Sequence, residues 1–176
     1  FASSWHDVAY ARWGLGANYH RAISAMQAVG LWTGSFVESS IGSQSRSSFA
    51  PFTVGGQART YVAYRGNGTN DMRIRFRAGT LWSGAAWSSA GTIAFTSSGP
   101  ALLPYGGTLW LAYREASTNA VTFKQMSTSG TWSGASTLPG AIQTDSDVAL
   151  AELGGNLYVF YRPMGTGSQP IRYFVR

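Results

Sequence analysis

The pentapeptide "GLWTG" (Gly30–Gly34) is followed by two near copies, "TLWSG" (Thr80–Gly84) and "GTWSG" (Gly130–Gly134). The tryptophans of the three copies are spaced by 50 residues in both intervals; they are Trp32, Trp82 and Trp132. Equal intervals in a chain of 176 residues are typical of an internal structural repeat. The sequence therefore predicts one supersecondary unit that recurs along the chain.

A second landmark, a Tyr-Arg pair at the end of an apolar run, recurs with nearly the same spacing. It occurs in "RTYVAYRG" (Arg59–Gly66), "TLWLAYRE" (Thr108–Glu115) and "NLYVFYRP" (Asn156–Pro163). A more divergent copy is "DVAYARWG" (Asp7–Gly14), in which Arg12 takes the arginine position. Short runs of this kind, bounded by glycine and other turn residues, predict β-strands.

Further strands are predicted on both sides of the Tyr-Arg runs. The stretches "ALLPYGG" (Ala101–Gly107) and "VALAELGG" (Val148–Gly155) predict a strand and a tight Gly-Gly turn that leads into the next strand. A third, alternating run follows in "DMRIRFR" (Asp71–Arg77) and "IRYFVR" (Ile171–Arg176), and "SFVESSI" (Ser35–Ile41) is an example of a fourth. Each repeat thus predicts up to four short strands, and no helix is predicted.

Composition agrees with an all-β fold, because only 11% of the residues are charged and 22 are glycines, while 44% are hydrophobic. Four short strands per unit, with glycine turns and aromatic landmarks, are typical of a β-propeller blade. We predict one propeller domain or half-propeller of about 3.5 to 4 blades, with repeats at about 1–48, 49–98, 99–146 and 147–176. We expect a second chain or a missing segment to complete the ring; the alternative is a compact four-bladed ring in which residues 1–6 pair with the final strand.

The charge pattern and the hydropathy limit the classes of partner. The net charge is +6, but the basic residues are dispersed, so the sequence predicts no nucleic-acid-binding arm. No apolar stretch approaches 18 residues, and we expect no membrane insertion. The chain has no cysteine and therefore no disulfide or thiolate site. It starts at Phe1 instead of Met, which we interpret as a processed or partial chain.

Two repeated side chains have the chemistry of a sugar-binding site. A tryptophan ring can cover the apolar face of a pyranose, and a planar arginine fork can bind neighbouring hydroxyls in bidentate fashion. Trp87 and Trp110 are further aromatic candidates. The predicted ligand-binding residues, including two nearby acids, are Trp32, Trp82, Trp132, Arg12, Arg65, Arg114, Arg162, Glu115 and Glu152.

Structural roles compete with this interpretation. The tryptophans can instead lock a turn between blades. The tyrosines of the Tyr-Arg pairs share a strand face with aliphatic residues, so we expect them in the core between blades; they are Tyr64, Tyr113 and Tyr161. The arginines point to the opposite face, where Glu115, Glu152 or a turn carbonyl would pair with them.

We predict no catalytic residue, no metal site and no cofactor. The seven acids do not recur with the repeat, and none of them pairs in the manner of a glycosidase dyad. His6 and His20 do not have a metal-ligand spacing. Asp145 and Asp147 are expected in a turn, where aspartate bonds the nearby backbone.

The stretch "DVAYARWGLGANYHRA" (Asp7–Ala22), followed by "GLWTG", resembles the repeat of the bacterial seven-bladed β-propeller lectins of the Photorhabdus lectin type. In that repeat an Asp-Val-Phe-x-Arg strand precedes a Tyr-His-Lys strand and then Trp-Ser-Gly. The resemblance covers the whole chain as a repeat pattern. It implies binding of fucose-type or related monosaccharides in several shallow pockets on or between blades, without catalysis. The tryptophan and arginine series stand at the matching positions.

The later repeats also resemble sialidase-like propellers with Asp-box units, as in "GPALLPYGGTLWLAYRE" (Gly99–Glu115) and "STSGTWSG" (Ser127–Gly134). Ser129 stands where the box has aspartate. This resemblance implies an arginine triad, a tyrosine nucleophile with a glutamate partner and an aspartate acid. The chain spans too little of a six-bladed ring to hold that complete site.

We therefore predict a bacterial carbohydrate-binding protein, or lectin, that is secreted or located at the cell surface. It would bind glycans or glycoconjugates through several shallow sites, as a homo-oligomer or in association with a missing propeller segment. Several weak sites on one rigid body raise avidity for a glycan-coated surface. The alternatives are a sialidase-like glycoside hydrolase, or a fragment of one, and a non-catalytic interaction module accessory to a secreted enzyme.

Overall fold

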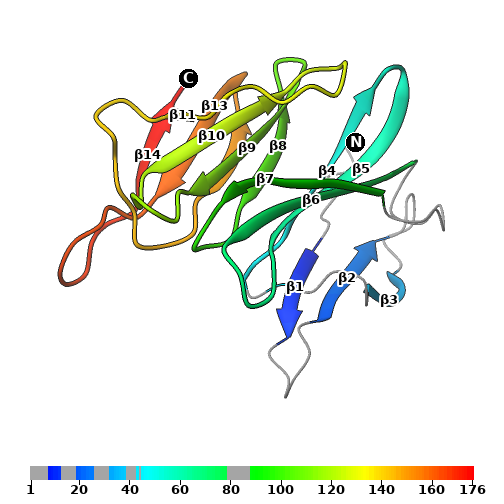
Figure 1. Cartoon of the computed structure of the whole chain (residues 1–176), viewed down its shortest axis with the longest axis horizontal. Coiled ribbons are helices and arrows are strands. Elements are labelled where there is room, and N and C mark those ends of the chain that lie inside the picture. Colours follow the sequence, from blue (N-terminus) through cyan, green and yellow to red (C-terminus); the bar gives the residue numbers. More distant parts are fainter. Residues whose placement is uncertain (1–7, 13–18, 26–31, 39–42, 44, 79–87) are drawn as a thin grey trace.

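The computed structural model describes residues 8–12, 19–25, 32–38, 43, 45–78 and 88–176, with side chains from Ser43 onward. In these ranges the protein is all-β, as predicted, and no helix is present. The strands form four antiparallel sheets of three or four strands each, and in every sheet the strands follow one another in chain order (Figure 1).

The four sheets succeed one another along the chain. The first contains β1 (Val8–Arg12), β2 (Tyr19–Ala25) and β3 (Trp32–Glu38). The second contains β4 (Ser48–Val54), β5 (Gln57–Arg65), β6 (Asp71–Ala78) and β7 (Ser88–Phe95). The third contains β8 (Ala101–Tyr105), β9 (Thr108–Arg114), β10 (Val121–Met126) and β11 (Ser136–Thr137). The fourth contains β12 (Ala149–Leu153), β13 (Asn156–Tyr161) and β14 (Arg172–Val175).

Gly-Gly turns join the first two strands of the second, third and fourth sheets. Each turn needs two successive residues with positive φ, which only glycine adopts without steric cost. The φ angles are 57° and 76°, 56° and 75°, and 60° and 77° at Gly55–Gly56, Gly106–Gly107 and Gly154–Gly155. The two hairpins predicted at residues 101–107 and 148–155 are thus confirmed.

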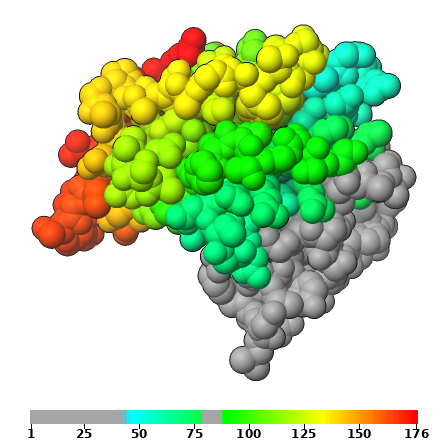
Figure 2. All heavy atoms as spheres, in the orientation of Figure 1, coloured from blue at the N-terminus to red at the C-terminus, as the bar shows by residue number. Residues whose placement is uncertain are grey.

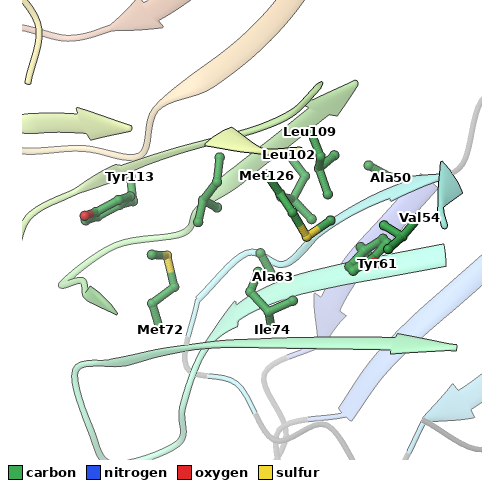
Figure 3. Packing of buried hydrophobic residues seen from close by; sticks show 11 residues of the cluster. Ala50, Val54, Tyr61, Ala63, Met72, Ile74, Leu102, Leu109, Tyr113 and Met126 are labelled. Carbon is green, nitrogen blue, oxygen red and sulfur yellow. The ribbon is translucent and has the colours of Figure 1, made fainter. Parts of the chain in front are cut away.

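The core consists of layers between neighbouring sheets. One buried cluster joins the second sheet, through Ala63 and Ile74, to the third sheet, through Leu111 and Tyr113 (Figure 3). A second cluster joins Val121 and other residues of the third sheet to the fourth sheet. The tyrosines of the Tyr-Arg pairs belong to these clusters or, for Tyr64, to a smaller one with Val62, and all three are buried. Their predicted place in the core is confirmed.

The segments that precede the second, third and fourth sheets lie close together. Strand β8 lies beside both β4 and β12, and the backbone N–H of Leu102 donates a hydrogen bond to the hydroxyl of Ser48 at 2.9 Å. Just ahead of these strands, the N–H of Gly99 donates to Oδ1 of Asp147 at 2.7 Å. The guanidinium of Arg46 donates to the carbonyl of Val148 and lies 3.9 Å from Oδ2 of Asp147. This polar junction connects the second, third and fourth sheets.

Gly99 tests the importance of the junction. A Cβ at this position would lie 2.9 Å from both the carbonyl oxygen of Arg46 and Oδ2 of Asp147, closer than Cβ atoms pack. We expect Gly99→Ala to lower the free energy of unfolding in urea by about 1–3 kcal/mol, because the junction must open. Gly134→Ala is the matched control, since no atom lies within 4 Å of its Cβ. Equal stabilities of the two variants would contradict the role of the junction.

Candidate ligand-binding site

A Ser/Thr-x-Ser turn precedes the second, third and fourth sheets. Its three copies start at Ser43, Thr96 and Thr144. The first hydroxyl of each copy is buried and accepts the backbone N–H two residues later at 3.2 Å. In two copies this hydroxyl also donates to the carbonyl of a Tyr-Arg arginine, from Thr96 to Arg114 at 2.8 Å and from Thr144 to Arg162 at 2.6 Å. These hydrogen bonds therefore connect the turn that precedes a sheet to the end of the second strand of that sheet.

The side chains of the predicted arginines return to the same turns. Arg162 binds Oδ1 of Asp145, with distances of 2.9 Å from Nε and 2.8 Å from Nη2. Nε of Arg114 donates to the hydroxyl of Ser97 at 2.7 Å. Ser97 and Asp145 are the middle residues of two successive Ser/Thr-x-Ser turns. Asp145 thus lies in the turn predicted for it.

Arg65 differs from Arg114 and Arg162 because its guanidinium binds connecting segments of two sheets. It donates to the carbonyl of Thr69 at 3.0 Å and to Oδ1 of Asn70 at 2.9 Å within its own sheet. It also donates to the carbonyl of Ser97 at 3.3 Å, ahead of the next sheet. The three predicted arginines with described side chains are therefore paired with turn groups, as the structural alternative expected.

The acceptors in these arginine contacts do not include Glu115 or Glu152, contrary to part of the structural alternative. Glu115 follows β9 and is half-buried, and Glu152 is exposed on β12. Any sugar that used these arginines would bind forks that are already oriented by the protein.

Among the repeated tryptophans, Trp132 has a described side chain. It lies in the β10–β11 connection, forms a backbone bridge with Met126, and packs against the cluster between the second and third sheets. Trp110 is buried in β9. Four sequence candidates fall outside the described side chains: Trp82 and Trp87 lie outside the described residues, and of Trp32 and Arg12 only the strand positions in β3 and β1 are described.

A shallow hollow of about 390 Å³ lies where the third and fourth sheets meet. Its walls come from the β11–β12 connection, the end of β13 and the start of β14. The lining residues are Gly140, Ala141, Ile142, Gln143, Tyr161, Pro163, Met164 and Arg172. The exposed loop between β13 and β14 (orange) projects from the surface beside it (Figure 2).

The walls of the hollow are fixed by backbone hydrogen bonds. The N–H of Met164 donates to the carbonyl of Gln143 at 3.0 Å, and the N–H of Val121 donates to the carbonyl of Ile142 at 2.8 Å. Ala141 has a φ of 48°, a left-handed conformation that costs an alanine about 1–2 kcal/mol. This strained turn shapes one wall of the hollow.

The hollow combines three kinds of group. Tyr161 is an aromatic lining residue that is almost wholly buried, and Met164 adds an exposed apolar side chain. Arg172 is exposed and offers a planar set of donors. The amide nitrogen of Gln143 donates to the carbonyl of Thr118 at 2.9 Å, which holds this side chain in place. A mostly polar wall with a smaller apolar part suits a small hydroxylated ligand.

Most of this hollow was missed from the sequence. Among its lining residues, the repeat pattern predicts a role for Tyr161, and that role is a position in the core. The available signal was the Pro-Gly pair of Pro139 and Gly140, which marks a turn, together with the glycine-rich stretch after Pro163. Neither signal specifies that the two loops lie side by side.

Several acids are held in structural contacts. Asp71 pairs with Arg73 at 3.3 Å, Asp145 pairs with Arg162, and Asp147 binds the junction at Gly99. The described side chains contain no group of three His, Cys, Asp or Glu residues arranged to hold a metal ion. Nor does the described part of the chain contain a helix long and apolar enough to cross a membrane.

Tyr113 has an unusual environment. Burial, and secondly the negative charge of Glu115, raise the pKa of its phenol from 10.0 to about 12. The ring is packed in the cluster between the second and third sheets. A buried phenol with a raised pKa is a poor nucleophile near neutral pH. The Tyr113–Glu115 pair therefore does not have the properties of an activated catalytic tyrosine.

No protein-family model matches the chain, and no curated protein matches it. The resemblances drawn from the repeated motifs stay predictions.

The Ser/Thr-x-Ser turn makes a stability prediction. Thr144→Val leaves the half-buried N–H of Ser146 and the carbonyl of Arg162 without their hydroxyl partner, which costs about 1–3 kcal/mol of unfolding free energy. Asp145→Asn removes the charge from a pair whose two side chains are 48% and 32% exposed, which costs less than about 1 kcal/mol. Urea denaturation of both variants checks this order, and a reversed order would contradict it.

Tyr113 makes a prediction about alkaline pH. Because its folded pKa lies above 10.0, its contribution to stability is complete below pH 10 and is lost as the pH rises from 10 to 12. Tyr113→Phe removes the ionising group, so we expect its unfolding free energy to fall less steeply than that of the wild type over this range. Chemical denaturation at pH 9, 10 and 11 measures both slopes, and parallel slopes would contradict the prediction.

Proposed function

We propose that this protein is a non-catalytic carbohydrate-binding protein that is secreted by, or displayed on, a bacterium. The observation that carries the proposal is the hollow between the third and fourth sheets, where Tyr161, Met164 and Arg172 meet. A pyranose presents an apolar C–H face and a rim of hydroxyls, and this hollow offers a small apolar part beside a larger polar wall that includes a planar donor group. Fucose-type monosaccharides are the first candidates.

We further propose that the four sheets are blades of a β-propeller. Three observations support this arrangement: the sheets follow one another along the chain, their first strands β4, β8 and β12 are neighbours, and equivalent residues ahead of these strands meet at Arg46, Gly99 and Asp147. A second chain, or a segment outside this sequence, would complete the ring. Repetition then gives several weak sites on one rigid body, which raises avidity for glycan-coated surfaces.

The hydrolase alternative is less well supported. A sialidase-like site needs an accessible tyrosine activated by a glutamate, whereas Tyr113 is buried beside Glu115 and has a raised pKa. The aspartates Asp71, Asp145 and Asp147 are engaged with arginines or with the backbone. A non-catalytic interaction module, the other alternative, would share the fold but not the sugar affinity.

A binding assay tests the proposal. We expect the labelled full chain to bind fucosylated or related glycans on an array, and Arg172→Ala to weaken the binding of the best monosaccharide about tenfold in calorimetry, because a charge-assisted hydrogen bond is lost. Arg73→Ala is the control for charge, since Arg73 is an exposed arginine on the second sheet.

Three outcomes of this test would contradict the proposal. If no glycan binds, the interaction module is favoured. If Arg73→Ala weakens binding as much as Arg172→Ala, attraction by net charge replaces the specific site. If the chain releases the fluorophore from an aryl sialoside, the protein is a hydrolase.

A further inference from the structure

The fourth sheet has an apolar face that no part of the described chain covers. On β13, Leu157 and Val159 are buried, and Val159 belongs to the cluster shared with the third sheet, so the alternate residues Tyr158 and Phe160 lie on the opposite face. Strand register places Val175 opposite Tyr158, and Tyr173 opposite Phe160. We call the outer aromatic face the set Tyr158, Phe160, Tyr173 and Val175.

The three rings of the outer aromatic face lie close together and are partly exposed, since Tyr158 and Phe160 are half-buried. The ring centroids of Tyr158, Phe160 and Tyr173 lie 5.8–6.1 Å from one another. Tyr173 is 61% exposed and Val175 is 43% exposed. Burying a large apolar side chain is favourable by about 1.5–3 kcal/mol, so leaving this cluster in water is costly. Exposed aromatic clusters of this kind mark interaction surfaces.

The repeat shows what covers such a face. Counted back from the Tyr-Arg pairs, Tyr158 and Phe160 correspond to Tyr61 and Ala63 in the second sheet. Both of these are buried, in the cluster that the third sheet completes. The next equivalent, Ala112 in the third sheet, is buried in the cluster that the fourth sheet completes. In each case the cover is the following sheet of the same repeat.

The covering faces also share a sequence pattern. They present an aliphatic residue and the tyrosine of the Tyr-Arg pair, as in Leu111 and Tyr113 or in Val159 and Tyr161. Strand β1 contains the tripeptide Val8-Ala9-Tyr10, the same as Val62-Ala63-Tyr64 of β5, and Tyr10 pairs with Arg21 as Tyr64 pairs with Arg73. In this alignment Ala11 takes the arginine position, so the prediction that Arg12 takes it is wrong. The first sheet of the chain thus carries the sequence of a covering sheet.

We propose that the outer aromatic face binds the first sheet, β1–β3, of a second copy of this chain. The contact is head-to-tail, so two copies close a ring when each last sheet meets the other's first sheet. Four sheets in each copy give eight in the pair, within the usual size of propellers of about 4–8 blades. The inference depends on the repeat and on the propeller arrangement proposed above, and not on sugar binding.

Light scattering of the purified full chain tests the proposal. We expect the wild type to have twice the mass of 18.8 kDa. Tyr173→Asp should give a monomer at the same concentration, because it places a charge in the centre of the contact. Phe95→Asp is the matched control and should stay a dimer, since Phe95 is 56% exposed on β7, away from the outer aromatic face. Near-UV circular dichroism verifies that each variant is folded.

Tyr10→Asp distinguishes the two modes of association. Head-to-tail packing predicts that this variant is also monomeric and that its mixture with Tyr173→Asp forms a dimer through the one intact contact. A Tyr10→Asp variant that stays dimeric would show that two outer aromatic faces pair with each other, which overturns the head-to-tail arrangement.

Two further outcomes bear on the partner. A monomeric wild type up to millimolar concentration would overturn the second copy as the partner. A Phe95→Asp variant as monomeric as Tyr173→Asp would overturn the assigned surface. The hollow lies within one copy, so the monomeric Tyr173→Asp variant should keep the monosaccharide affinity of the wild type. Sugar binding without dimers would therefore contradict this inference and leave the proposed function standing. Dimers without sugar binding would do the reverse.

Discussion

The central physical constraint is that the third and fourth sheets carry apolar residues on both faces. Such a sheet cannot be stable alone in water and must be covered on each side by a neighbour. The third sheet meets this requirement within the chain, because one buried cluster joins it to the second sheet and another joins it to the fourth. The fourth sheet meets it on one side. On the other side, its outer aromatic face has no covering sheet in the described part of the chain. The packing of the third sheet within the chain and the proposed assembly both depend on this requirement.

The second constraint is the polar attachment of each sheet to the turn before it. The buried hydroxyls of Thr96 and Thr144 bind the backbone at the end of the second strand, and Arg114 and Arg162 bind the middle residues of the same turns. These arginines are therefore part of the framework, with half-exposed forks of fixed orientation. The hollow, by contrast, is lined mainly by residues of the β11–β12 and β13–β14 connections, together with Tyr161 and Arg172 from the adjoining strand ends. The framework and the proposed recognition site thus use largely different parts of the repeat.

The sequence predicted the features that depend on periodicity. The Gly-Gly hairpins and the buried tyrosines of the Tyr-Arg pairs were expected, because turn chemistry and strand alternation act locally. The Ser/Thr-x-Ser turns were not recognised, since serine and threonine are abundant throughout the chain and a hydroxyl acquires its role from a distant carbonyl. The hollow was missed for a similar reason, because Gly140 and Arg172 are brought together by the packing of the third and fourth sheets. Propeller closure and sugar binding remain proposals.

Amide hydrogen exchange of the full chain, measured over a range of concentrations, tests most directly whether coverage of both faces stabilises each sheet. The account predicts that the amides of β9, in the sheet covered on both sides, exchange slowest at every concentration. It also predicts that protection of β13 and β14 rises with concentration, as a second copy covers the outer aromatic face. Exchange of β9 as fast as that of β14 would contradict the account, and so would protection of β14 that is independent of concentration.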